Sequence, residues 1–129
     1  MNLEQGGVVR AVLDMTTALA QRGHDVVVLT HDERDRPAEW IDGAPNTPRV
    51  INLGPLTAKG KRLTPQQAAE ADKLVAQSEM VHLHGAWKLA NNQIVKSCRA
   101  HGVPYALSCH GMLDDWSMAQ RTLKKRVYL

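Results

Sequence analysis

The sequence predicts a single α/β domain, residues 1–129, in which helices cover both faces of a parallel sheet. Segments with helical periodicity alternate with short apolar segments along the 129 residues. The apolar segments are rich in β-branched residues and lack polar alternation, which is typical of strands buried on both faces. Helices that alternate with such strands favour parallel pairing and a doubly wound sheet.

The composition is that of a globular protein without a spanning segment. Hydrophobic residues make up 43% and charged residues 22%, and the net charge of +3 fits an anionic ligand or an anionic membrane surface. The two cysteines, Cys98 and Cys109, lie in apolar contexts and are expected to be buried thiols. No signal peptide and no apolar run of about 18 residues is present, so we expect a cytoplasmic location.

The first half of the chain is expected to form a helix and two strands. Apolar residues at helical spacing are predicted to face the core: Val8, Val12, Met15 and Leu19. Gly23 is placed to end this helix. Strands are predicted at 26–30 and 49–53, separated by a long, proline-bearing loop at 31–48.

A helix with a well-marked start opens the second half. Thr64 is the expected N-cap, Pro65 the first helical residue and Gln67 the partner in a capping box, with the helix ending near Gln77. A strand is predicted at 80–84.

Two helices and one strand complete the predicted order. Asn91 or Asn92 is expected to cap a helix that ends at Gly102, followed by a strand at 103–109 and a helix at 115–129. One face of the last helix is apolar: Trp116, Ala119, Leu123 and Val127.

The usual first strand of a doubly wound domain is missing from this order. That strand normally lies in the middle of the sheet and leads into the first loop and helix. Here the chain opens on the loop itself, which leaves a gap between strands 26–30 and 80–84. Either the sequence is truncated or another segment fills the gap.

Gly6 and Gly7 precede the first helix and are candidates for anion binding. Glycines let a phosphate approach the backbone, and the helix start offers amides and a favourable dipole. The alternative is that the two glycines only form a turn.

Three histidines are expected at one edge of the sheet. His82 and His84 are two residues apart on a strand and share a face, and His110 directly follows the next strand. We favour hydrogen-bonding or ligand-contact roles over a metal site, because no carboxylate has ligand spacing and Cys109 points away from His110.

His110 is the strongest single candidate, because it stands between a strand end and Gly111. It is suited to acid–base work, to binding a sugar hydroxyl or to capping, and we favour a ligand role. Trp87 is suited either to stack on a sugar or to cover the top of a helix. The last helix carries the basic residues Arg121, Lys124 and Lys125, which form either a lipid-binding face or a solvated one.

Several common site motifs are absent. The sequence lacks Gly-x-Ser-x-Gly, the Walker loop and Gly-x-Gly-x-x-Gly. Its basic residues are not interleaved with aromatic ones, so no nucleic-acid partner is expected.

The motifs together resemble a known family. The matching stretches follow one another in order: Gly6 to Val26, Val81 to Trp87, Pro104 to Asp114, and Trp116 with Lys124-Lys125-Arg126. They resemble the N-terminal, Rossmann-like half of a GT-B-fold glycosyltransferase of family 4. The resemblance implies retaining transfer of a sugar from a nucleotide-sugar to a glycan or lipid-linked acceptor, as in polysaccharide biosynthesis, without a metal or other cofactor.

The resemblance also assigns roles to residues. It places Gly6 and Gly7 at the donor diphosphate and His110 with Gly111 at the donor sugar. It places the acceptor near His84, Trp87 and Lys88. The basic residues of the last helix, Arg121, Lys124 and Lys125, would face the inner surface of a membrane in peripheral contact.

The chain departs from the family pattern at several points. Many relatives have proline where Cys109 and Asp115 stand. Glu70 and Glu79 lack the spacing and setting of the glutamate pair in the family's C-terminal domain, which is missing here. We therefore expect a fragment truncated at both ends that is inactive alone. The alternative is a non-catalytic Rossmann-like module that binds an anion or a partner.

Overall fold

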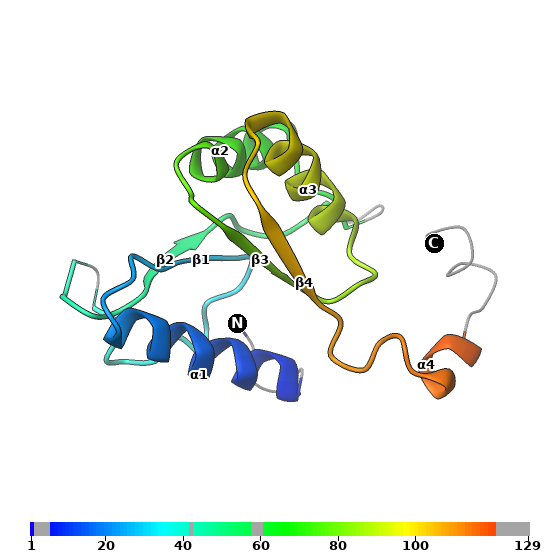
Figure 1. Cartoon of the computed structure of the whole chain (residues 1–129), viewed down its shortest axis with the longest axis horizontal. Coiled ribbons are helices and arrows are strands. Elements are labelled where there is room, and N and C mark those ends of the chain that lie inside the picture. The colour runs from blue at the N-terminus through cyan, green and yellow to red at the C-terminus, as the bar shows by residue number, and fades with distance from the viewer. Residues whose placement is uncertain (2–5, 42, 58–60, 121–129) are drawn as a thin grey trace. The chain divides into compact units, whose positions relative to one another are not determined.

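The computed structural model describes residues 1, 6–41, 43–57 and 61–120, with helices and strands in the predicted order (Figure 1). The elements are α1 (Gly7–Gln21), β1 (Val27–Thr30), β2 (Arg49–Asn52), α2 (Pro65–Ala76), β3 (Val81–His84), α3 (Leu89–His101), β4 (Tyr105–Ser108) and α4 (Asp115–Ala119). The chain divides into two compact units, Met1–Pro55 and Leu56–Leu129, which are described in turn.

Both strand pairs are parallel, as the sequence predicts. In the first unit, β1 pairs with β2 from Val27 opposite Arg49 onward. In the second unit, β3 pairs with β4, which brings His84 opposite Ser108. Across the described ranges each of these sheets has two strands, and the single doubly wound sheet stays a prediction.

The core of the first unit forms around a loop residue. Trp40, 2% exposed, clusters with Leu13, Val28 and Met1. Its indole N–H donates to Oγ1 of Thr17 on α1 at 3.2 Å.

The first helix consequently buries a different face from the predicted one. Leu13, Thr16 and Ala20 are its buried residues. Those predicted to face the core are only half-buried: Val8, Val12, Met15 and Leu19. The prediction was wrong because Trp40 packs against the helix from a loop, a contact that the spacing of apolar residues within the helix does not encode.

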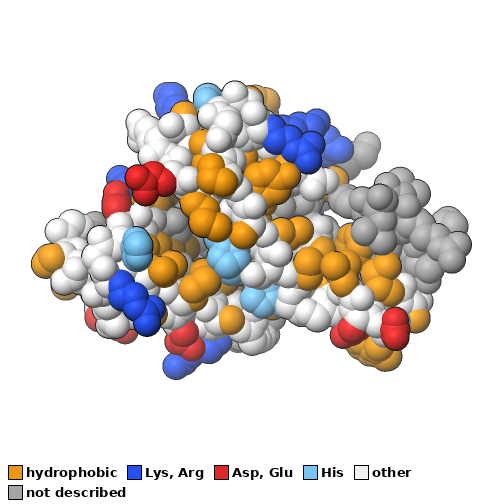
Figure 2. Space-filling model, in the orientation of Figure 1, with side chains coloured by type: hydrophobic (Ala, Val, Ile, Leu, Met, Phe, Trp, Pro, Cys, Tyr) orange, Lys and Arg blue, Asp and Glu red, His pale blue; other side chains and the backbone are white. Residues whose placement is uncertain are grey.

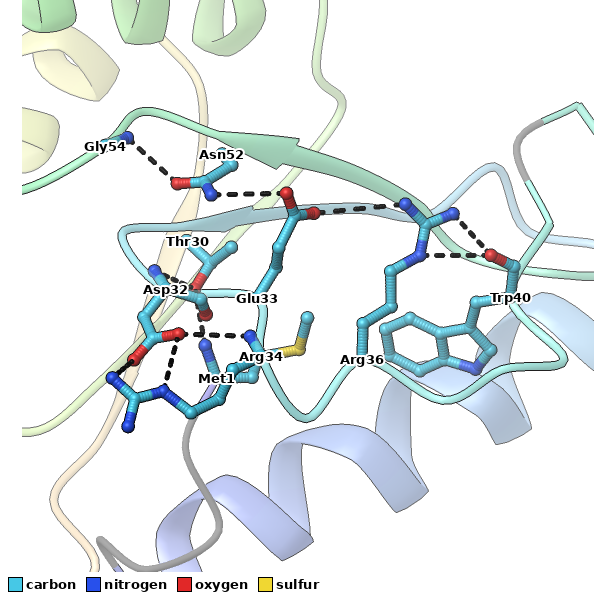
Figure 3. A network of polar contacts seen from close by, with 9 residues as sticks. All are labelled: Met1, Thr30, Asp32, Glu33, Arg34, Arg36, Trp40, Asn52 and Gly54. Carbon is cyan, nitrogen blue, oxygen red and sulfur yellow. Dashed lines mark hydrogen bonds and ion pairs between the residues drawn. The ribbon is translucent and has the colours of Figure 1, made fainter.

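Polar contacts organise the loop between β1 and β2 (Figure 3). The Arg36 guanidinium donates to the Trp40 carbonyl, at 3.0 Å from Nε, and lies 3.9 Å from the Glu33 carboxylate. The amide of Asn52 donates to Glu33 at 3.3 Å and its oxygen accepts from the Gly54 N–H at 2.9 Å. These contacts tie the loop to the end of β2.

The second unit packs α2 and α3 against each other beside the β3–β4 pair (Figure 1). Its buried apolar residues come from both helices, from β3 and from the loop before α2: Leu63, Ala71, Val75, Leu83, Ala90, Ile94 and Cys98. Asp72 of α2 accepts from the Ser97 hydroxyl at 2.5 Å and contacts Nε2 of His101 at 3.1 Å, both on α3. Apolar burial and these polar contacts together join the two helices.

The helix starts test the capping predictions. The capping box of Thr64 and Gln67 is present at the start of α2. The prediction for α3 was wrong, because this helix begins at Leu89 and neither Asn91 nor Asn92 caps it. The last helix begins after Asp114, whose carboxylate accepts from the Ser117 N–H.

Two further predictions concern the burial of the strands and the extent of the last helix. The strands are not buried on both faces, since Leu29, Tyr105 and Leu107 are 36%, 37% and 45% exposed. The described part of the last helix ends at Ala119, and Trp116 on it is 73% exposed. Leu123 and Val127 of its predicted apolar face lie outside the described residues.

Candidate functional site

The candidate site lies where β3 and β4 end together. Their parallel register places His84 beside Ser108, the last residue of each strand. The Gly85 N–H then donates to the Ser108 carbonyl at 2.9 Å, which extends the pairing by one residue. The loops after both strands therefore start side by side, as expected for the carboxyl edge of a parallel sheet.

Three imidazoles lie in a row along one face of this edge: His82, His84 and His110. We call them the imidazole row. The ring centroids of His82 and His84 are 4.3 Å apart, and those of His84 and His110 are 5.2 Å apart. Nδ1 of His84 lies 2.9 Å from Nε2 of His110, and Nε2 of His82 lies 2.8 Å from the Ser108 hydroxyl. Figure 2 shows histidine side chains exposed over the β3–β4 region.

The backbone at His110 adopts an unusual conformation. His110 has φ of 50° and Gly111 has φ of 74°, so two successive residues occupy the left-handed region. That region is costly for a residue with a Cβ and is common at functional sites. The turn is closed by the Met112 N–H, which donates to the Cys109 carbonyl at 3.0 Å. As a result, the His110 side chain is exposed next to a glycine, as its position in the sequence predicts.

Trp87 connects the loop after β3 to the loop after β4. Its indole N–H donates to the Met112 carbonyl at 3.3 Å, and the residue is half-buried. Lys88 is exposed and forms the N-cap of α3. A Cβ added at Gly85 would lie 3.1 Å from Cε of Lys88, and Gly85 has φ of 89°, so both space and conformation favour glycine there.

Asn91 is a site residue that the sequence analysis misassigned. Its side-chain amide donates to the carbonyls of His84 and Gly85 at 3.2 and 2.8 Å. It therefore holds the end of β3, although it was predicted to cap α3. The Asn-Asn pair at 91–92 is the signal that was available, but the helix boundary decides which role an asparagine takes.

A family model decides the class of this protein. The model of Glycosyltransferase Family 4 matches residues 5–129. The chain belongs to glycosyltransferase family 4. Comparisons with curated proteins and with solved structures found no match.

In this glycosyltransferase, the environment keeps the middle imidazole neutral. Burial, followed by the neighbouring His82, His110 and Lys88, lowers the pKa of His84 to about 4. Two facing ring nitrogens 2.9 Å apart require one N–H and one lone pair, so a neutral His84 is compatible with this contact. The described residues contain no group of three or more His, Cys, Asp or Glu side chains arranged to hold a metal ion.

The candidate anion-binding glycines, Gly6 and Gly7, lie in the first unit of this glycosyltransferase. Gly6 is the N-cap of α1 with φ of 96°, and no side chain caps this helix start. Gly6 and Gly7 are exposed, and a Cβ on either would meet no atom within 4 Å. The start of α1 is therefore open to an anion, while its convergence with His110 on one cleft stays a prediction.

The first unit also has a groove that the sequence analysis did not predict. It has a volume of about 290 Å³ and lies between α1 and the loop after β1. Its lining is mixed: Arg10, Leu13, Asp14, Thr17, Ala18, Gln21, Pro37 and Glu39. Arg10 and Asp14 pair with each other at 3.2 Å, so the charges at the groove are partly matched within the protein.

The next feature is the basic face predicted for the last helix. Arg121, Lys124 and Lys125 lie outside the described residues. Within the described part of the chain, no helix has the length and apolar character needed to cross a membrane.

Proposed function

We propose that the chain is the acceptor-binding half of a retaining glycosyltransferase. The complete enzyme, of which this chain is one half, moves a sugar from a nucleotide-sugar to a glycan or lipid-linked acceptor without a metal, and the half alone is inactive. The observation that carries the proposal is an exposed histidine, His110, held beside Gly111 at the carboxyl edge of a parallel strand pair in a family 4 chain. Ligands bind at such edges because loop amides and side chains converge there.

The proposed roles follow from the groups available. The open start of α1 at Gly6 and Gly7 offers amides and a helix dipole to the departing diphosphate. His110 and Gly111 hold the donor sugar, while Trp87 and Lys88 contribute to the acceptor side. The protein acts in the cytoplasm, where Arg121, Lys124 and Lys125 make peripheral contact with the inner face of the membrane.

A nucleotide-binding partner domain is part of this proposal. Isothermal titration of the chain alone with nucleotide-sugars should show no tight binding, because the nucleotide is held by that second domain. Affinity in the low micromolar range would overturn the fragment hypothesis and favour an independent binding module.

Sugar transfer is tested with the chain joined to a family 4 nucleotide-binding domain. His110→Ala should lower kcat/KM by roughly 100-fold through loss of sugar positioning. His24→Ala removes an exposed histidine of the first unit and should leave transfer unchanged. Unchanged turnover of the His110→Ala enzyme would remove His110 from the site.

A further inference from the structure

The two members of the imidazole row whose ring nitrogens lie at hydrogen-bond distance, His84 and His110, have differently held backbones. His84 ends a paired strand, and its carbonyl accepts from the Asn91 amide at 3.2 Å. The next residue, Gly85, bonds to Ser108 through its N–H and to Asn91 through its carbonyl. His110 instead lies on a turn with φ of 50°, and it is exposed. The better-held ring is therefore that of His84.

The contact between them engages one nitrogen of each ring. Nε2 of His110 faces Nδ1 of His84 at 2.9 Å, within hydrogen-bond distance. In this contact one imidazole donates and the other accepts, so the tautomer of one ring fixes that of the other. Nδ1 of His110 is left as the nitrogen that a ligand can meet.

We propose that His84 is a positioning residue for His110: the bond between their rings fixes the tautomer and orientation of His110 and presents its Nδ1 to the ligand. The role of His110 toward that ligand rests on the proposed function. The bond between the rings does not, so the two can fail separately. His84 thus acts through His110 and not by direct contact with the acceptor.

The state of His84 suits this role. Its lowered pKa keeps the ring neutral near neutral pH, so it does not repel a second imidazole at hydrogen-bond distance. Because His84 stays neutral, its Nδ1 can hydrogen-bond to Nε2 of His110 over the pH range in which sugar transfer is to be measured. The hydrogen bond made by one ring nitrogen of a histidine sets which nitrogen carries the proton.

Nitrogen NMR of the intact chain tests the proposal without any substrate. In the wild type, the two ring nitrogens of His110 should have well-separated chemical shifts, one typical of an N–H and one of a lone pair. In His84→Ala, the tautomer ratio of His110 should change by about 3- to 10-fold toward that of a free imidazole, which is the expected effect of losing one neutral hydrogen bond.

Two further variants keep the test specific. His84→Asn places an amide near the position of Nδ1 that can hydrogen-bond to Nε2 of His110, so its His110 tautomer ratio should lie closer to that of the wild type than the ratio in His84→Ala does. His82→Asn is the matched control, because the His82 ring packs on that of His84 but its hydrogen bond is to Ser108. It should change the His110 nitrogen shifts less than His84→Ala does.

Each outcome decides the question. Unchanged His110 nitrogen shifts in both His84→Ala and His84→Asn would overturn the proposal, as would an equal change in His82→Asn. If His84→Ala fails to fold, His84→Val replaces it, because valine suits a strand and has no hydrogen-bonding side chain. A changed His110 tautomer ratio in His84→Val supports the proposal, and unchanged nitrogen shifts overturn it. A chain that shows this coupling but supports no sugar transfer when it is joined to a family 4 nucleotide-binding domain would contradict the proposed function and leave the positioning role intact.

Discussion

At the scale of single residues, His84 links the site to the acid sensitivity of the fold. Its folded-state pKa of about 4 lies below the unperturbed imidazole value of about 6.5. Between these two values the unfolded chain binds a proton that the folded chain does not. Lowering the pH through this window therefore favours unfolding. We expect the free energy of unfolding, measured by urea denaturation, to decrease from about pH 7 to about pH 4.5.

The contribution of His84 is isolated by comparing how much the free energy of unfolding decreases with pH in the wild type and in variants. His84→Asn removes the titrating ring and should show a smaller decrease than the wild type. His24→Asn, at an exposed position of the first unit, should keep the decrease of the wild type. Equal decreases in wild type and His84→Asn would show that His84 does not contribute.

Local sequence predicted the position of some site residues but not their contacts. A histidine followed by glycine at a strand end is a local pattern, and His110 lies where that pattern places it. The contacts of His84 with His110 and of Trp87 with Met112 span 26 and 25 residues. Such pairs depend on strand register and loop path, so neither periodicity nor motif spacing specifies them.

At the scale of elements, the start of α2 is where sequence and structure agree most closely. The Thr64 hydroxyl accepts from the Gln67 N–H at 3.2 Å, and the Gln67 side chain accepts from the Thr64 N–H at 2.9 Å. Thr64→Ala should lower the free energy of unfolding by about 1 kcal/mol, because an amide at the helix start loses its partner. Urea denaturation at neutral pH measures this change.

The control for the cap is Gln66→Ala, an exposed position in the same helical turn. It should change the free energy of unfolding by less than about 0.5 kcal/mol. A Thr64→Ala change no larger than that of Gln66→Ala would mean that the cap adds nothing to stability.

Elements were predictable where their signals are local. A capping box involves residues three positions apart, so it can be read from the sequence. The buried face of α1 depends on Trp40, which packs against it from a loop. The role of Asn91 likewise depends on the end of β3, to which its amide bonds from inside α3. In both cases a contact distant in sequence or outside the helix outweighs the local pattern.

At the scale of the whole molecule, the alternation of helices and strands predicted parallel pairing but not how many strands join one sheet. Parallel pairing follows from the connections, since a helix lies between β3 and β4. Each described sheet has two strands, and a sheet this small depends on the helices packed beside it. Strand count depends on which edges find partners, which composition and periodicity do not encode.

Hydrogen exchange of the β3 amides tests whether this sheet ends at β3. The N–H groups of Val81 and Gly85 donate toward β4, at 3.0 Å to Pro104 and 2.9 Å to Ser108. Successive amides of a strand point to opposite sides, so those of His82 and His84 point to the other edge, where no described strand pairs with β3. We expect the His82 and His84 amides to exchange at least about tenfold faster than those of Val81 and Gly85. Comparable protection of all four would place another strand against β3 and restore the continuous sheet that the sequence predicts.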